Sequence, residues 1–180
     1  NIDDMLKTES LRLNKLPLPL LVLGILFCTT LSFGCEESSP KPMSQSMNKI
    51  MPLGASRVEG ARPVFESYRY ELWKLLNADS FEFDFVGTKT DEATYPWFEG
   101  EQFDPDHEGR GGWTSQQILN NISSWLDDTG PVDVVLFSSP GGNDILSASA
   151  TVDEMLDNIN QIIDIIQEDN PNVVIIVEKL

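Results

Sequence analysis

The chain has 180 residues, which allows one domain of ordinary size and excludes two large ones. It carries 12 Lys and Arg against 29 Asp and Glu, a formal net charge of −17, so a nucleic acid would be repelled rather than attracted. Two cysteines and one histidine exclude a zinc cluster and a disulfide framework, while 41% hydrophobic and 23% charged residues exclude wholesale disorder.

Residues 1–35 have the layout of an export signal. Lys7, Arg12 and Lys15 form a basic start, residues 16–35 carry no charge, and smaller residues gather toward the end of that apolar stretch. A retained transmembrane anchor of about 20 apolar residues is the alternative interpretation. The small-residue ending favours cleavage, so we expect the protein to be exported.

Cys35 is the candidate lipidation site. The stretch Leu31–Cys35 resembles the lipobox of bacterial lipoproteins, although Ser32 stands where that family prefers Leu. Residues 36–47 are polar and rich in Pro and Ser, which indicates a flexible tether. We therefore expect a periplasmic or cell-surface domain over residues 48–180, which meets the membrane only through a lipid anchor or an uncleaved signal.

Strands and helices alternate from Asn48 onward. Apolar runs predict strands over 49–53, 133–139 and 172–180, and three alternating phenylalanines predict a strand over 81–87 with one wetter face. Apolar residues at helical spacing predict helices over 67–78, 114–126 and 152–169, with Ser67, Thr114 and Thr151 as their caps. Residues 88–112 are polar and rich in Gly, and are predicted to form a long loop.

This order of elements predicts an α/β fold, with a mainly parallel sheet and helices on both of its faces. Pro52 weakens the first strand, because proline cannot donate to the hydrogen-bond ladder. In such folds, ligands bind at the carboxyl ends of the strands. The residues that directly follow each strand are therefore the candidate functional residues.

Three segments that follow predicted strands carry a family resemblance. They read GASRVEG at 54–60, DHEGRGGWT at 106–114 and GGND at 141–144. Together with the stretches IMPLG, SYRYELWKLL and DFVGT, they resemble the SGNH (GDSL-type) hydrolase superfamily, in particular its carbohydrate-esterase branch called family three. The resemblance runs from Lys49 to Leu180 and implies a three-layer, flavodoxin-like α/β/α fold.

The resemblance also implies a serine esterase that acts on acetylated polysaccharides, oligosaccharides or other small esters, without a cofactor or a metal. Ser56, on a tight turn after a strand, is the expected nucleophile. The backbone N–H groups of Ser56 and Gly112 and the side-chain amide of Asn143 are the expected donors to the oxyanion of the tetrahedral intermediate.

Several positions depart from the family's pattern. Ala55 replaces the Asp of Gly-Asp-Ser, Arg57 and Val58 replace an apolar-Thr pair, and Gly142 replaces a Thr. The family's Asp-x-x-His block, which supplies the base, lies on a loop after a further strand, and this sequence does not reach that loop. We therefore expect a partial sequence that lacks the last strand and helix and is inactive by itself.

Other interpretations stay open at this point. His107 matches the family's Asp-His-Glu-Gly segment rather than its base, so we expect it to pack in the loop and to help position Gly112. The departures also fit a catalytically inactive surface lipoprotein that binds glycans. A flavodoxin-like nucleotide binder is less well supported, because no phosphate-binding glycine motif follows the first strand and the net charge opposes phosphates.

Overall fold

A computed structural model of the protein describes residues 48–178, and the predictions for the export signal, Cys35 and the tether lie outside them. The strands are β1 (Lys49–Gly54), β2 (Asp84–Phe85), β3 (Lys89–Thr90), β4 (Asp106–Gly109), β5 (Val134–Ser138) and β6 (Val174–Val177). The helices are α1 (Ser56–Glu59), α2 (Arg69–Ala78), α3 (Ser115–Leu119), α4 (Ile122–Thr129), α5 (Gly142–Ser147) and α6 (Val152–Asp169).

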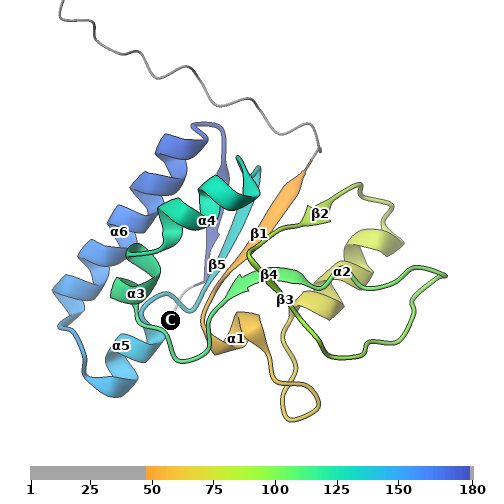
Figure 1. The fold of residues 1–180 in the computed structure, drawn as a ribbon, viewed down its shortest axis with the longest axis horizontal. Coiled ribbons are helices and arrows are strands. Elements are labelled where there is room, and N and C mark those ends of the chain that lie inside the picture. The colour runs from red at the N-terminus through yellow and green to blue at the C-terminus, as the bar shows by residue number, and fades with distance from the viewer. Residues whose placement is uncertain (1–47, 179–180) are drawn as a thin grey trace, which may run out of the picture. The chain divides into compact units, whose positions relative to one another are not determined.

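All of these strands belong to one mainly parallel sheet. The strand order is β3-β4-β1-β5-β6, and β2 pairs with the start of β1. β1 is parallel to β2, β4 and β5, and β5 is parallel to β6, whereas β3 is antiparallel to β4. Figure 1 shows α3, α4 and α6 on one side of this sheet and α2 on the other. The predicted three-layer α/β fold is therefore confirmed.

Pro52 lies inside β1 without interrupting the sheet. On one side of β1, Ile50 pairs with β2 and Leu53 pairs with β4, so the neighbouring strand changes at Pro52. The Ile50 carbonyl accepts the N–H of Val86 on that side at 2.9 Å, and the backbone groups of residues two apart in a strand point the same way. The N–H that proline lacks therefore falls in the gap between β2 and β4.

Two hydrophobic cores lie on the two faces of the sheet. The larger one joins β1 and β5 to α3, α4 and α6, and its fully buried members include Met51, Phe137, Ile122, Leu126 and Ile162. The smaller one joins the opposite face to α2, and its buried members are Ile50, Trp73, Phe85 and Phe103. Parallel strands are usually buried on both faces, and β1 and β5 at the centre of this sheet follow that rule.

Thr114 and Thr151 cap their helices as predicted. Each hydroxyl accepts a backbone N–H from the third residue of the helix, and the side chain of that residue, Gln117 or Glu154, accepts the N–H of the cap in return. Ser67 lies one residue before the N-cap position, which Tyr68 occupies, but its hydroxyl accepts the N–H of Arg69, the first residue of α2, at 3.4 Å. The same hydroxyl donates to the carbonyl of Val58 at 2.8 Å.

The prediction of a loop over residues 88–112 is wrong in part, because β3 and β4 lie inside that range. β4 reads DHEG, which is too polar for hydrophobic periodicity to identify as a buried strand. The buried carboxylate of Glu108 accepts the N–H of Thr88 at 2.7 Å and pairs with Arg110 at 2.6 Å. These partners let a charged residue occupy a buried strand.

Two further boundaries differ from the predictions. The strand expected over 81–87 is reduced to Asp84–Phe85, since the residues before it end α2. The N–H of Phe81 donates to the Leu76 carbonyl at 3.0 Å, and the Phe81 side chain is 60% exposed. The helix expected over 114–126 is broken into α3 and α4 at residues 120–121.

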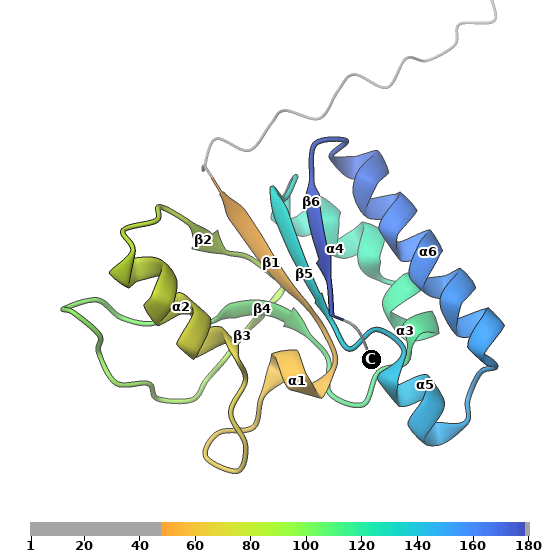
Figure 2. The same cartoon turned by 180° about the vertical axis from the view of Figure 1, so that it is seen from behind.

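β6 forms an edge of the sheet beside β5, as Figure 2 shows. A buried strand was predicted here, but Val174 and Ile176 are 55% and 56% exposed. β6 is apolar because it extends the sheet beside β5. Within residues 48–178, however, no layer covers the side chains of Val174 and Ile176. Within the same range, no helix is both long and apolar enough to cross a membrane.

His107 is buried in β4, where its Nδ1 accepts the N–H of Gly109 at 2.9 Å. Burial lowers the pKa of its imidazole from 6.5 to about 3, since a low-dielectric site disfavours the charged ring, and the positive charge of Arg69 adds to the effect. The ring is therefore neutral at ordinary pH and acts as a hydrogen-bond acceptor within β4.

This shift predicts a pH dependence of stability. Between about pH 6.5 and 3 the unfolded chain binds a proton at His107 that the folded chain does not, so the free energy of unfolding falls as the pH falls. The variant His107→Asn keeps an acceptor but cannot titrate, and we expect its stability to fall less from pH 7 to pH 4.5. Urea unfolding of both proteins across this range measures the difference.

Asp104 contributes with the opposite sign, because burial raises the pKa of its carboxyl to about 6, but it is common to both proteins and cancels in the comparison. Equal slopes for the two proteins would contradict the assigned state of His107.

Candidate active site

Three strands end at the same level and deliver the three motif segments to one place. Gly54 at the end of β1 pairs with Gly109 at the end of β4 and with Ser138 at the end of β5. In Figures 1 and 2, α1, α5 and the connection from β4 to α3 gather at this end of the sheet. The segments that carry Ser56, Gly112 and Asn143 therefore meet at the carboxyl edge, as the sequence predicts.

Ser56 is the first residue of α1, directly after a sharp turn at the end of β1. The Ala55 carbonyl accepts the N–H groups of Val58 and Glu59, at 3.1 and 3.0 Å, which folds the chain into a single helical turn. Ser56 is half-buried, and neither its N–H nor its hydroxyl bonds to any group in residues 48–178. Both groups are available to a ligand.

Gly112 lies in a segment whose other N–H groups are all engaged. The N–H of Arg110 donates to the Gly54 carbonyl at 2.9 Å, that of Gly111 to the Glu59 carboxylate at 2.9 Å, and that of Trp113 to the Arg110 carbonyl at 3.2 Å. The N–H of Gly112 has no acceptor within the described part of the chain. Gly112 also has φ +79°, a conformation that favours glycine.

Asn143 lies in the first turn of α5 and is joined to this segment. Its Nδ2 donates to the carbonyl of Trp113 at 2.7 Å. An amide nitrogen carries two hydrogens, so this bond fixes the orientation of the group and leaves its second N–H to donate elsewhere. The structure thus places Asn143 against the segment that carries Gly112, and Glu59 joins that segment to the turn of Ser56.

Asp144 joins the first turn of α5 to the start of α3. It was not identified as a site residue from the sequence. Its side chain is buried, and its two oxygens accept the N–H and the hydroxyl of Ser115 at 2.7 and 2.8 Å. Asn158 of α6 donates to the same hydroxyl at 3.1 Å. The available signal was the Asp of GGND, directly after Asn143.

The fully buried side chain of Arg69 binds the backbone of the turn that carries Ser56. Its guanidinium donates to the carbonyls of Val58 and Glu59, at 2.7 and 3.0 Å, and pairs with the carboxylate of Asp91 at 2.7 Å. A guanidinium with this many acceptors can be buried without an uncompensated charge. No sequence pattern indicated this role, because an arginine on a short helix is usually solvated.

The departures from the family's pattern have visible local effects. Ala55 precedes α1 at the capping position and offers no side-chain acceptor. Arg57, 65% exposed, pairs with Glu178 at 2.7 Å and so joins the turn to the end of β6. Gly142 donates its N–H to the Ser139 carbonyl at 3.2 Å, a bond that needs no side chain.

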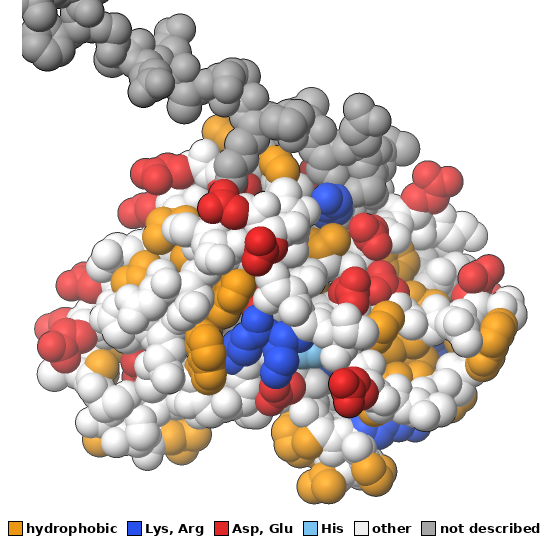
Figure 3. All heavy atoms as spheres, in the orientation of Figure 1, with side chains coloured by type: hydrophobic (Ala, Val, Ile, Leu, Met, Phe, Trp, Pro, Cys, Tyr) orange, Lys and Arg blue, Asp and Glu red, His pale blue; other side chains and the backbone are white. Residues whose placement is uncertain are grey.

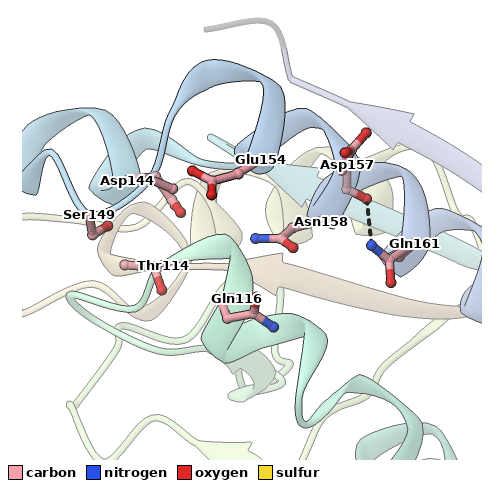
Figure 4. Close-up of a pocket in the computed structure, with 9 residues that line it drawn as sticks. Thr114, Gln116, Asp144, Ser149, Glu154, Asp157, Asn158 and Gln161 are labelled. Atoms are coloured by element: carbon pink, nitrogen blue, oxygen red, sulfur yellow. Dashed lines mark hydrogen bonds between the residues drawn. The ribbon is translucent and has the colours of Figure 1, made fainter.

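A polar cavity of about 350 Å³ lies beside this edge, between α3 and α6 (Figure 4). Thr114, Glu154, Asp157 and Gln161 are among its lining residues, and Asp144 connects it to the site. It contains none of Ser56, Gly112 and Asn143. We place the site at the strand ends, because the free serine and N–H groups lie there. Within residues 48–178, no group of three His, Cys, Asp or Glu side chains could hold a metal ion.

Solved structures of carbohydrate esterases match the chain. A family 3 carbohydrate esterase from Talaromyces cellulolyticus is 30% identical with a TM-score of 0.62, over 73% of this chain and 61% of that one. A family 3 carbohydrate esterase from Clostridium thermocellum is 37% identical with a TM-score of 0.58, over 72% and 60%. A serine-to-alanine mutant of an acetyl esterase, solved with an acetate ion, is 31% identical with a TM-score of 0.62, over 73% and 61%.

No protein-family profile matches the sequence, and a search of curated proteins gives no match. The chain spans 60 to 61% of the length of the solved esterases. Across that span the sequence identity and the shared fold point the same way as the three motif segments. The chain has the fold of the SGNH hydrolases and resembles their family 3 carbohydrate esterases in sequence and in structure.

Proposed function

We propose that the protein is an exported serine esterase that removes acetyl groups from a carbohydrate. The observation that carries the proposal is the free N–H of Gly112. It lies in a segment whose other N–H groups are all hydrogen-bonded, and which is joined to the Ser56 turn on one side and to Asn143 on the other. Donors fixed in advance toward an empty position are what stabilises a developing oxyanion.

The proposed reaction is acyl transfer in two steps. The Ser56 hydroxyl attacks the carbonyl carbon of the ester, and its proton passes to a base. The carbonyl oxygen becomes an anion that accepts from the N–H groups of Ser56, Gly112 and Asn143. Collapse of this intermediate breaks the bond to the sugar oxygen, which takes the proton from the base, and water then releases acetate from the acetyl-serine.

His107 does not suit the part of the base. Its Nδ1 already accepts the Gly109 N–H, its ring is buried in β4, and its lowered pKa leaves little affinity for a proton at neutral pH. The resemblance to the SGNH hydrolases implies that an Asp-x-x-His block supplies the base. In residues 48–178, no histidine or carboxylate bonds to the Ser56 hydroxyl.

The charge of the chain favours a neutral substrate. Acidic side chains are spread over the face shown in Figure 3, and the formal net charge is −17. A polyanion would therefore be repelled, whereas an acetylated neutral sugar would not. The similar proteins are described as carbohydrate esterases and as an acetyl esterase, which supports the same substrate class.

A catalytically inactive surface lipoprotein that binds glycans is the second candidate. Ala55 favours it, because the turn of Ser56 lacks the side-chain acceptor that the family's Asp would provide. The two candidates differ in whether Ser56 is needed.

Replacement of Ser56 separates the candidates. We expect the full-length protein from its gene to release acetate from acetylated xylan, and Ser56→Ala to lower kcat by roughly 10⁴-fold or more, as loss of a nucleophile does. Ser124→Ala, an exposed serine on α4, is the matched control and should keep full activity. Glycan binding without acetate release, unchanged in Ser56→Ala, would instead establish the second candidate.

We further propose that export ends in lipidation at Cys35, as its lipobox-like context supports. In a bacterial host given radiolabelled palmitate, the full-length protein should incorporate label and Cys35→Ser should not. A labelled Cys35→Ser variant, or an unlabelled wild-type protein released into the medium, would contradict lipidation.

A further inference from the structure

We propose that Glu59 is a positioning residue, which holds the glycine segment so that the Gly112 N–H is aimed at the oxyanion. This inference rests on the proposed esterase function and extends it to a residue outside the Ser, Gly and Asn positions of the site. Glu59 lies at the end of α1, three residues after Ser56, so it belongs to the same turn as the nucleophile.

The Glu59 carboxylate makes two bonds that cross the site. Its Oε2 accepts the N–H of Gly111 at 2.9 Å, and its Oε1 accepts the ammonium of Lys89, from β3, at 2.7 Å. One carboxylate therefore joins the nucleophile turn, the oxyanion segment and a neighbouring strand. The Glu59 side chain is 32% exposed and that of Lys89 41%, so water screens the pair only in part.

The backbone of Glu59 is itself fixed. Its carbonyl accepts from the buried Arg69 guanidinium at 3.0 Å, and its N–H donates to Ala55 at 3.0 Å. Gly109, at the end of β4, packs so closely on Glu59 that a Cβ there would overlap its backbone nitrogen. The Glu59 carboxylate therefore extends from a fixed backbone. The segment that it contacts contains two consecutive glycines and is flexible by composition.

That segment needs an external support because it contains two consecutive glycines. Gly111 and Gly112 have the widest range of backbone conformations, and the direction of the Gly112 N–H depends on the two torsions of Gly111. The bond from Gly111 to Glu59 fixes the peptide unit before those torsions, and the Trp113 N–H, which donates to the Arg110 carbonyl at 3.2 Å, fixes the peptide unit after Gly112. Without Glu59, the segment keeps its bonds at Arg110 and Trp113 but loses the bond to the Gly111 N–H, directly before the two torsions that orient the Gly112 N–H.

Lys89 offsets the negative charge that Glu59 places near the proposed oxyanion hole. A carboxylate near the oxyanion hole would oppose the negative charge that develops in the transition state. The ion pair with Lys89 neutralises that charge while leaving Oε2 free to accept from Gly111. Removal of Lys89 should therefore impair the reaction even though the bond from Gly111 to Glu59 survives.

The test uses the full-length protein and p-nitrophenyl acetate as the substrate. We expect Glu59→Ala to lower kcat by about 10- to 100-fold, less than the 10²- to 10³-fold typical for removal of an oxyanion donor, with KM changed by less than about 3-fold. Glu59→Gln should restore most of kcat, because its amide oxygen can accept from Gly111. Lys89→Met should lower kcat without raising KM.

Glu71→Ala is the matched control, because Glu71 pairs with Lys74 at 2.8 Å on the exposed side of α2 and does not touch the site. A second measurement, the hydrogen-exchange rate of the Gly111 amide by NMR, should rise in Glu59→Ala and stay unchanged in Glu71→Ala. This reading does not depend on turnover and shows whether a variant has merely unfolded.

The outcomes separate this inference from the function on which it rests. If the wild-type protein hydrolyses the ester and Glu59→Ala keeps its kcat, or loses activity through KM alone, Glu59 has no positioning role and the esterase function stands. If the wild-type protein and Ser56→Ala both fail to hydrolyse the ester, the esterase function is wrong and the role of Glu59 falls with it.

Discussion

The register of β1 between β4 and β5 is the constraint on which the candidate site depends. Because Gly54 pairs with both Gly109 and Ser138, the three strands end together and the segments that follow them start from one level. A slip of one residue on either side would turn every side chain of that strand to the other face and separate the segments. The register is in turn fixed by the two cores, which bury alternate residues of β1 on opposite faces.

Beyond the carboxyl ends of the strands, the segments that form the site are held together by polar contacts rather than by apolar packing. Arg69, Glu59 and Asp144 each join two segments that lie far apart in the sequence, and two of these three side chains are buried. Buried polar groups stabilise a structure only when each has its partners, and one missing partner costs more than the bond contributed. Such a network specifies the positions of loops more sharply than apolar contacts would.

The sequence predicts the parts of the fold that follow hydrophobic periodicity. The apolar runs of β1 and β5, the stripe of α6 and the capping threonines were all identified, since one side of each element is buried in a core. β4 was missed because His107 and Glu108 are buried with polar partners that only the folded chain supplies. Pro52 was expected to weaken β1 for a similar reason. The sequence does not show that β2 ends and β4 begins beside it, so that no neighbouring strand needs the missing N–H.

The candidate site divides in the same way. Ser56, Gly112 and Asn143 were predicted from motifs that follow strands, and the structure places their segments at one edge of the sheet. Glu59 and Arg69 could not be predicted with a role, because each acts on residues that only the tertiary fold brings near, whereas Asp144 had a signal in its place directly after Asn143. A carboxylate or an arginine on a short helix carries no signal of such a partner in its neighbours in the sequence.

Covalent labelling of Ser56 tests the central claim most directly. The full-length protein would be treated with diethyl p-nitrophenyl phosphate, which phosphorylates an activated serine, and its peptides would be mapped by mass spectrometry. A live nucleophile beside an oxyanion hole predicts one adduct, on the peptide that contains Ser56, and none in Ser56→Ala. An adduct on another serine, or no adduct in a folded protein, would contradict the assignment of Ser56 as the nucleophile.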